Sequence, residues 1–271
     1  MPNRPGSPAH VPFAGLLGLG FVTDFLDTLG VGSFATTSSV LKLGKLVDDE
    51  QIPGTMNVGH SLPTMLEAAL YITVIQVELV TLVAMIGASA VGAWFGAGLV
   101  ASWPRRTIQR ALAGGLLATA VFIFLREVGV FPAGGDALAL TGVALVVGVL
   151  VNALIGSLTS LGIGNYAPCM ALVSLLGMNP IAAFPIMMGS AALTLPLAAA
   201  RFIPARRFDR RVALGLTIGG IPGVLVAAFI VVSLPLAAVR WLVIGVLLYT
   251  AVLMWRSARH GPVLSPVTPA A

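Results

Sequence analysis

The chain has 271 residues, of which 58% are hydrophobic and 9% charged, and its mean hydropathy is +1.00. A soluble domain carries roughly 25% charged residues, so this composition excludes a soluble enzyme, a nucleic-acid-binding protein and a disordered scaffold. It predicts an all-α polytopic integral membrane protein, and we expect it in the cell (inner) membrane. The formal net charge of +5 comes from basic residues between apolar runs, where such residues set topology.

The two ends of the chain differ in composition from the apolar middle. Residues 1–11 and 257–271 are rich in proline and small polar residues, and we expect disordered cytoplasmic ends flanking a single membrane domain over 12–256. The first apolar run contains two aspartates and lacks a clear small-residue cleavage site, which predicts a retained segment. Cys169 is the single cysteine, so no intrachain disulfide can form.

Eight apolar regions follow one another along the chain, and a transmembrane helix needs about 20 mostly apolar residues. Two regions are long and interrupted: 12–46 is broken at LGVGS (29–33), and 137–177 is broken at LGIGN (161–165). A Gly-x-Gly sequence in an apolar run favours a turning backbone over a continuous helix. The other regions predict membrane-spanning helices over 57–75, 77–101, 107–126, 180–200, 212–233 and 236–256.

The two breaks belong to an internal duplication. LGVGS aligns with LGIGN, and collinear matches continue through both halves at nearly the same spacing. The duplication divides the domain into repeat one, 12–126, and repeat two, 137–256. Repeated halves are typical of secondary transporters.

The distribution of basic residues favours one topology. If each interrupted region crosses the membrane once, nine basic residues lie on the side of the N-terminus and six lie opposite. If each region enters and returns, thirteen share the side of the N-terminus and two lie opposite. The positive-inside rule prefers the second arrangement, which predicts an inverted repeat with both termini cytoplasmic. Each half then holds an interrupted helical hairpin and three transmembrane helices. The second limbs of the hairpins, 33–46 and 165–177, are short and are either re-entrant or thin tilted crossings.

The helices that begin after the breaks predict an anion site. Ser33 and Asn165 are good N-cap residues, and helix N-termini present free N–H groups and a positive dipole end. Inverted symmetry would bring the two ends together near the midplane, with Thr37, Thr64 and Thr159 among the nearby hydroxyls. Alternatively, the hydroxyls bond helix carbonyls and the glycines only allow close packing. The predicted substrate-binding residues are Gly30, Gly32, Ser33, Thr36, Asn57, His60, Gly162, Gly164, Asn165, Tyr166 and Ser190.

Ionisable residues in the apolar regions are confined to the first half. They are Asp24, Asp27, His60 and Glu67, and the residues aligned with them in the second half are uncharged. Intramembrane ionisable residues are costly, and a symmetric scaffold does not require them, so we expect them to couple transport to protons. The alternatives are interfacial positions or an internal pair that only fixes packing.

Both halves carry small residues at every fourth position. In the first half they are Ala88, Gly92 and Gly96, and at the aligned positions of the second half they are Gly219, Gly223 and Ala227. Such stripes allow helices to approach closely in lipid. We interpret them as packing surfaces.

The order of these motifs resembles that of the sulfite exporter TauE/SafE family, also called the toluene sulfonate uptake permease family. The likeness covers about residues 12–256. It rests on the breaks LGVGSFATTS and LGIGNYAPCM, on the segments IGASAVGAWFGAGLVASWP and IGGIPGVLVAAFIVVSLP, and on the endings TAVFIF and TAVLMW. The first break departs from the Gly-Gly-Gly-Pro form of the family, because Thr36 stands at the position where the second half has Pro168. The resemblance implies transport of sulfite, sulfoacetate or other organosulfonates.

Together these features predict a secondary transporter of small sulfur-containing anions, coupled to protons and able to form oligomers. An intramembrane enzyme that uses Ser33 and His60 is an alternative, although no nucleophile elbow is present. A passive anion channel is another. One cysteine and one internal histidine cannot supply a zinc site, so we expect neither a metal nor a cofactor.

Overall fold

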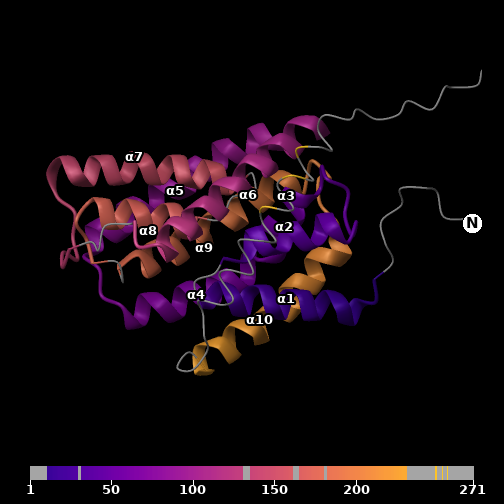
Figure 1. Cartoon of the computed structure of the whole chain (residues 1–271), viewed down its shortest axis with the longest axis horizontal. Coiled ribbons are helices and arrows are strands. Elements are labelled where there is room, and N and C mark those ends of the chain that lie inside the picture. Colours follow the sequence, from indigo (N-terminus) through magenta and orange to yellow (C-terminus); the bar gives the residue numbers. More distant parts are fainter. Residues whose placement is uncertain are drawn as a thin grey trace, which may run out of the picture.

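The computed structural model describes residues 11–29, 32–130, 135–160, 165–179 and 182–230, together with 248, 252 and 255. Within these ranges the chain is all-helical, with one isolated bridge between Ala137 and Met178. The predicted terminal segments, apart from residue 11, and most of the predicted helix 236–256 lie outside them. The helices are α1 Phe13–Thr28, α2 Ser33–Leu43, α3 Ile52–Gly59, α4 Ser61–Val74, α5 Leu79–Val100, α6 Arg105–Glu127, α7 Gly142–Thr159, α8 Tyr166–Leu175, α9 Ala183–Phe202 and α10 Arg210–Ile230 (Figure 1).

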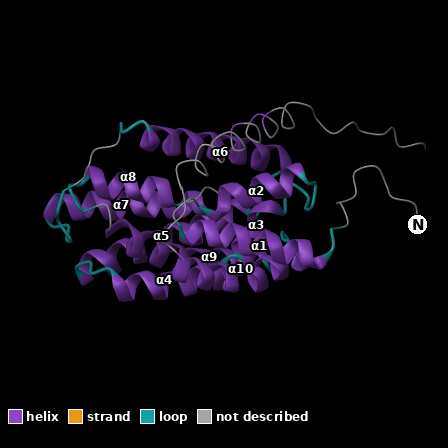
Figure 2. Cartoon of the chain, turned by 60° about the horizontal axis from the view of Figure 1, so that its bottom comes forward, coloured by secondary structure: helices purple, strands orange, loops and turns teal. Residues whose placement is uncertain are grey.

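Four of the described helices are long and apolar enough to cross a membrane: α5, α7, α9 and α10 over Arg210–Ala228. α5 and α7 lie along a common direction with most of the other helices (Figures 1 and 2), whereas α10 runs obliquely in the view of Figure 1. Large apolar side chains remain exposed on their outer faces, such as Phe95 on α5 and Leu150 on α7. Such surfaces suit lipid, and the four helices indicate a membrane protein, as the composition predicts.

The two predicted interruptions fall between α1 and α2 and between α7 and α8. Gly32 immediately precedes α2 with a φ of +90°, a left-handed conformation that favours glycine. The helices that follow the breaks have 11 and 10 residues. At about 1.5 Å per residue they extend only about 15 Å, roughly half the thickness of a hydrocarbon core.

The prediction of one continuous helix over 57–75 is wrong. The helix begins earlier, at Ile52, and His60 divides it into α3 and α4. Pro63 has no N–H to offer the carbonyl of Gly59, and that carbonyl instead accepts a hydrogen bond from the Thr217 hydroxyl of α10 at 2.7 Å. A partner from the other half of the chain therefore satisfies the break.

One end of the bundle, here called the basic end, gathers residues 11–12, 44–51, 101–104 and 203–209. The Arg207 guanidinium donates to Glu50 at 2.7 Å and to the carbonyl of Trp103, and Arg211 donates to the carbonyl of Val11. Because α1 begins near Val11 and α2 ends near residue 44, the first interrupted pair enters and leaves at this end, on the right of Figure 1.

The opposite end, here called the distal end, gathers residues 75–78, 135–141 and 176–179. The N–H of Glu78 donates to the carbonyl of Leu138, and the N–H of Asn179 donates to the carbonyl of Ala137. The start of α7 and the end of α8 therefore lie together at this end, on the left of Figure 1. The two interrupted pairs thus open toward opposite ends of the bundle.

The first helix of each interrupted pair packs against the other half of the chain. α1 packs along α10, and α7 packs along α5. At Gly92 of α5 an added Cβ would lie 1.8 Å from the carbonyl oxygen of Ala153 on α7, and at Gly223 of α10 it would lie 2.3 Å from that of Phe21 on α1. Gly92 and Gly223 occupy aligned positions in the duplication, and so do Phe21 and Ala153.

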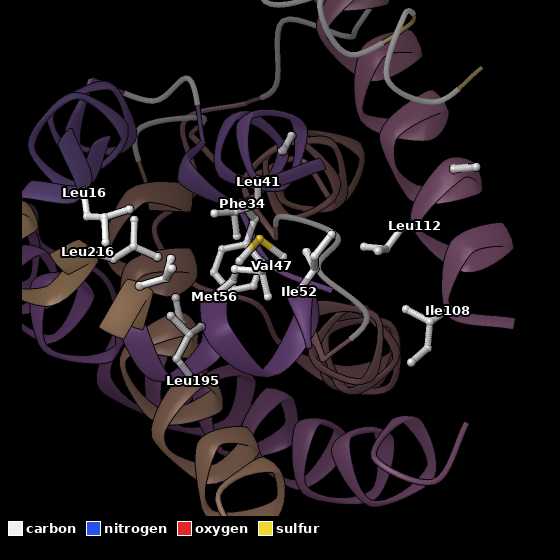
Figure 3. Close-up of a cluster of buried hydrophobic side chains, with 14 of the residues drawn as sticks. Leu16, Phe34, Leu41, Val47, Ile52, Met56, Ile108, Leu112, Leu195 and Leu216 are labelled. Atoms are coloured by element: carbon white, nitrogen blue, oxygen red, sulfur yellow. The ribbon is translucent and has the colours of Figure 1, made fainter. Parts of the chain in front are cut away.

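A buried apolar cluster holds α2 and α3 in the centre of the basic half of the bundle (Figure 3). Phe34 and Leu41 of α2 join Ile52 and Met56 of α3 there. Helices from both halves close around them, and the cluster also includes Leu16, Val47, Ile108, Leu112, Leu195 and Leu216. The short helix α2 is therefore fixed by packing on several sides.

Candidate functional site

A small cavity, here called the central cavity, lies between the N-terminal ends of α2 and α8. Its volume is about 20 Å³, room for one or two water molecules. Both halves of the chain contribute to its wall, which combines polar side chains with methionine and leucine. The lining residues are Asp27, Gly32, Ser33, Phe34, Thr64, Thr159, Asn165, Met187, Met188, Ala191 and Leu195.

Ser33 does not act as the predicted N-cap. Gly32 occupies the N-cap position of α2, and Ser33 is the first residue of the helix. The Ser33 hydroxyl donates to Oδ2 of Asp27 at 2.6 Å, and the backbone N–H of Ser33 also donates to the Asp27 carboxyl group. Asp27, from the preceding helix, therefore occupies the N-terminus of α2 with a carboxyl group of the protein itself.

Asn165 stands at the N-cap of α8, as predicted, but its side chain makes no capping hydrogen bond. Its amide instead donates to the carbonyl of Met187 on α9 at 2.8 Å. The first N–H groups of a helix have no hydrogen-bond partner within the helix. In α8 the first two belong to Tyr166 and Ala167. The next residue, Pro168, has no N–H. The start of α8 thus shares the central cavity with Asp27, whose carboxyl group is hydrogen-bonded to Ser33 at the start of α2.

A hydrogen-bonded group of His60, Asp24 and Thr37 lies beside the cavity, and all three side chains are fully buried. Nδ1 of His60 is 2.7 Å from Oδ1 of Asp24, and Nε2 is 3.0 Å from the hydroxyl of Thr37 on α2. The break between α3 and α4 places His60 so that its ring bridges α1 and α2. The hydroxyl that contacts His60 is that of Thr37, whereas Ser33 contacts Asp27, so the Ser33–His60 pair of the enzyme hypothesis is not formed.

A third carboxyl group completes the arrangement. Oε1 of Glu67 on α4 accepts a hydrogen bond from the Thr28 hydroxyl at 2.8 Å, and the hydroxyl of Tyr71 donates to the carbonyl of Thr28. One oxygen each from Asp24, Asp27 and Glu67 lies within 4.8 Å of the others. We call these three residues the carboxylate cluster.

The carboxylate cluster concentrates negative charge in the apolar interior. Asp24 and Glu67 have no exposed surface, and a buried charge is tolerated only when it is paired or neutralised. Among the described residues, His60 pairs with Asp24 of the cluster, and when its ring is protonated the imidazolium balances one carboxylate. The other two carboxyl groups are tolerated there only if they are protonated or paired with a further cation.

The structure brings together part of the predicted substrate site. Gly32, Ser33 and Asn165 line the central cavity, and His60 lies in the adjoining network with all the predicted coupling residues. Three predicted residues do not line the cavity: Thr36 donates to the carbonyls of its own helix, Asn57 to the carbonyl of Pro53, and Ser190 accepts from Asn152. Gly30, Gly162, Gly164 and the side chain of Tyr166 lie outside the described residues.

The chain matches none of the family models, curated proteins or solved structures with which it was compared. Function is therefore inferred from the central cavity and the carboxylate cluster, together with the motifs of the sequence.

Sequence reasoning missed two members of the network, Thr28 and Tyr71. Each follows an acidic residue by four positions, Thr28 after Asp24 and Tyr71 after Glu67. Residues four apart share a helix face, so that spacing was the available signal. Their contact with each other links α1 to α4 and could not be read from the spacing alone.

Proposed function

We propose that the chain is a secondary transporter that carries a small anion together with a proton. The observation that supports this most directly is the shared cavity between the N-terminal ends of α2 and α8, with Asp27 at the first of them. Helix N-termini bind anions through backbone N–H groups and the helix dipole, and discontinuous helices near the midplane form such sites in transporters.

Asp27 supplies the coupling in this proposal. While it is ionised, it accepts hydrogen bonds from the hydroxyl and the N–H of Ser33, which are the donors that a substrate anion needs. Two negative charges about 4 Å apart repel by about 4 kcal/mol at an effective dielectric constant of about 20, or roughly a thousandfold in Kd. A proton on Asp27 removes that repulsion and frees the donors, so one proton enters with each anion.

The proposed architecture is an inverted repeat with both termini in the cytoplasm. The exchanged packing of α1 on α10 and of α7 on α5 supports it, as do interrupted pairs that open toward opposite ends. The loops of the basic end carry Lys45, Arg206 and Arg207, whereas residues 75–78, 135–141 and 176–179 of the distal end contain no lysine or arginine. The positive-inside rule then assigns the basic end to the cytoplasm.

The proposed substrates are small sulfur-containing anions: sulfite, sulfoacetate or other organosulfonates. The sequence resemblance supports this class. Ser33, Thr64, Thr159 and Asn165 give the cavity a polar wall, but each now donates to an acceptor of the protein, so these donors reach a sulfonate only after rearrangement. A volume of about 20 Å³ is too small for such an anion, so the described conformation is closed and the helix ends must separate to admit substrate.

Uptake by proteoliposomes tests the proposal. We expect radiolabelled isethionate, an organosulfonate that stays ionised across the pH range, to accumulate when the outside is more acidic than the inside. A protonophore should abolish accumulation, and Asp27→Asn should bind the anion without gradient-driven accumulation. Asp48→Asn, which changes an exposed loop carboxylate, should behave as wild type. Equal accumulation with and without the gradient would contradict proton coupling, and the lack of any flux would contradict transport of this class.

A further inference from the structure

We propose that the carboxylate cluster binds one sodium ion, in competition with protons. The site consists of Asp24, Asp27 and Glu67, between α1 and α4. The proposal goes beyond anion–proton transport, because a cation can bind at this cluster whether or not the chain carries an anion. It rests on unpartnered oxygens, on charge balance and on the geometry of the ligand atoms.

Two oxygens of the cluster have no hydrogen-bond partner among the described residues. They are Oδ2 of Asp24 and Oε2 of Glu67, and both are buried. Burying an ionised carboxylate oxygen without a hydrogen-bond donor costs more free energy than burying a neutral polar atom, because its hydration is lost without replacement. Two such oxygens on residues of one cluster are positions where a proton or a bound cation would replace the lost hydration.

The described side chains around the cluster do not supply that partner. The titratable groups that face the cluster are His60, at the junction of α3 and α4, and Tyr71 on α4. α10 presents Gly220 to Oδ2 of Asp24, and α2 presents the hydroxyls of Ser33 and Thr37 to Asp27 and His60. An imidazolium at His60 balances Asp24, which leaves Asp27 and Glu67 to share a proton and a cation.

The ligand geometry suits a small, singly charged ion. Na⁺ is close in size to Ca²⁺, whose oxygen ligands lie at about 2.3–2.6 Å, so opposite ligands are about 5 Å apart. The three cluster oxygens lie within 4.8 Å of one another. Ca²⁺ takes 6–8 oxygen ligands, and Mg²⁺ gives up its water reluctantly. With an imidazolium at His60 and one shared proton, the cluster keeps one negative charge, which a singly charged ion such as Na⁺ balances and a divalent ion exceeds.

Thermal unfolding of the detergent-purified full chain, without substrate, tests the site. At pH 8 we expect NaCl to raise the Tm in a saturable way, while equal ionic strengths of KCl or N-methylglucamine chloride do not. Lowering the pH should move the Na⁺ midpoint upward, by up to about tenfold per pH unit if one proton competes with one ion. Equal shifts by all three salts, or a stronger response to CaCl₂ than to NaCl, would overturn the proposal.

Substitutions locate the ion. Glu67→Gln and Asp24→Asn should each abolish the Na⁺-dependent rise in Tm, and Asp48→Asn should retain it with the wild-type midpoint. A wild-type midpoint in Glu67→Gln would place the ion elsewhere and overturn the proposal. If that variant does not fold, ²²Na⁺ binding to the wild type decides instead, with K⁺ as competitor: saturable binding that KCl does not displace supports the site, and its absence overturns it. A Na⁺ response without anion flux would refute the transport proposal alone.

Discussion

Replacing Gly92 by alanine should separate α5 from α7. The new Cβ would lie 1.8 Å from the carbonyl oxygen of Ala153, whereas ordinary contact begins at 3.4 Å, so the backbones must part by about 1.6 Å. Overpacking of this kind costs about 1–3 kcal/mol. The separation would also weaken the hydrogen bond from the Ser157 hydroxyl to the Gly92 carbonyl, now 2.9 Å and worth about 1 kcal/mol.

The expected loss is therefore about 3 kcal/mol, or a fall in Tm of roughly 6–12 °C, measured by tryptophan fluorescence during heating in detergent. Gly87→Ala is the matched control, because it lies in the same helix and an added Cβ there meets nothing within 4 Å. It should be neutral or slightly stabilising, since alanine favours helix. Gly223→Ala should lower the Tm as well, because it crowds Phe21 across α10 and α1. Equal Tm values for Gly92→Ala and Gly87→Ala would refute the packing account.

Two further predictions concern the ends of the bundle. Glu78 caps α5 by accepting the N–H groups of its first turn, and these bonds lower the pKa of its carboxyl group below the ordinary 4.5. Because that pKa is depressed in the folded state, the stabilisation is present above about pH 4.5 and is lost as the pH falls through the folded value. Glu78→Gln should thus lower the Tm at pH 7 but not in strong acid; a difference that persists there would exclude the ionised cap. Asp49 is 4% exposed and accepts from Lys42 at 2.6 Å and from Gln109 at 2.6 Å. Asp49→Ala should cost about 3 kcal/mol in the same melting assay, and a loss below about 1 kcal/mol would show that the network does not stabilise the fold.

Local patterns predicted the features that depend on neighbours in sequence. Apolar run lengths located α5, α9 and α10, and the Gly-x-Gly breaks marked the end of α1 and the start of α2. The confinement of ionisable residues to the first half pointed to Asp24, Asp27 and Glu67, which lie together because α1 and α4 meet at these positions.

Features that depend on distant partners could not be predicted. The break at His60 is stabilised by Thr217, which belongs to the other half of the chain. Ser33 is a strong N-cap residue by propensity, yet Asp27 provides the acceptor at that end of α2, because the end of α1 places its carboxyl group 2.6 Å from the Ser33 hydroxyl. The Thr36 hydroxyl donates to a carbonyl of its own helix. Residue propensity alone cannot distinguish such a hydroxyl from one that binds a ligand.

Equilibrium binding across pH tests whether an anion binds only when Asp27 carries a proton. Isethionate affinity should be measured by scintillation proximity with the purified protein, at constant Na⁺ and ionic strength. Where Asp27 is ionised, we expect the Kd of the wild type to rise about tenfold per pH unit, whereas the Kd of Asp27→Asn should stay low and independent of pH. A wild-type Kd that is independent of pH, or a slope that persists unchanged in Asp27→Asn, would contradict the account.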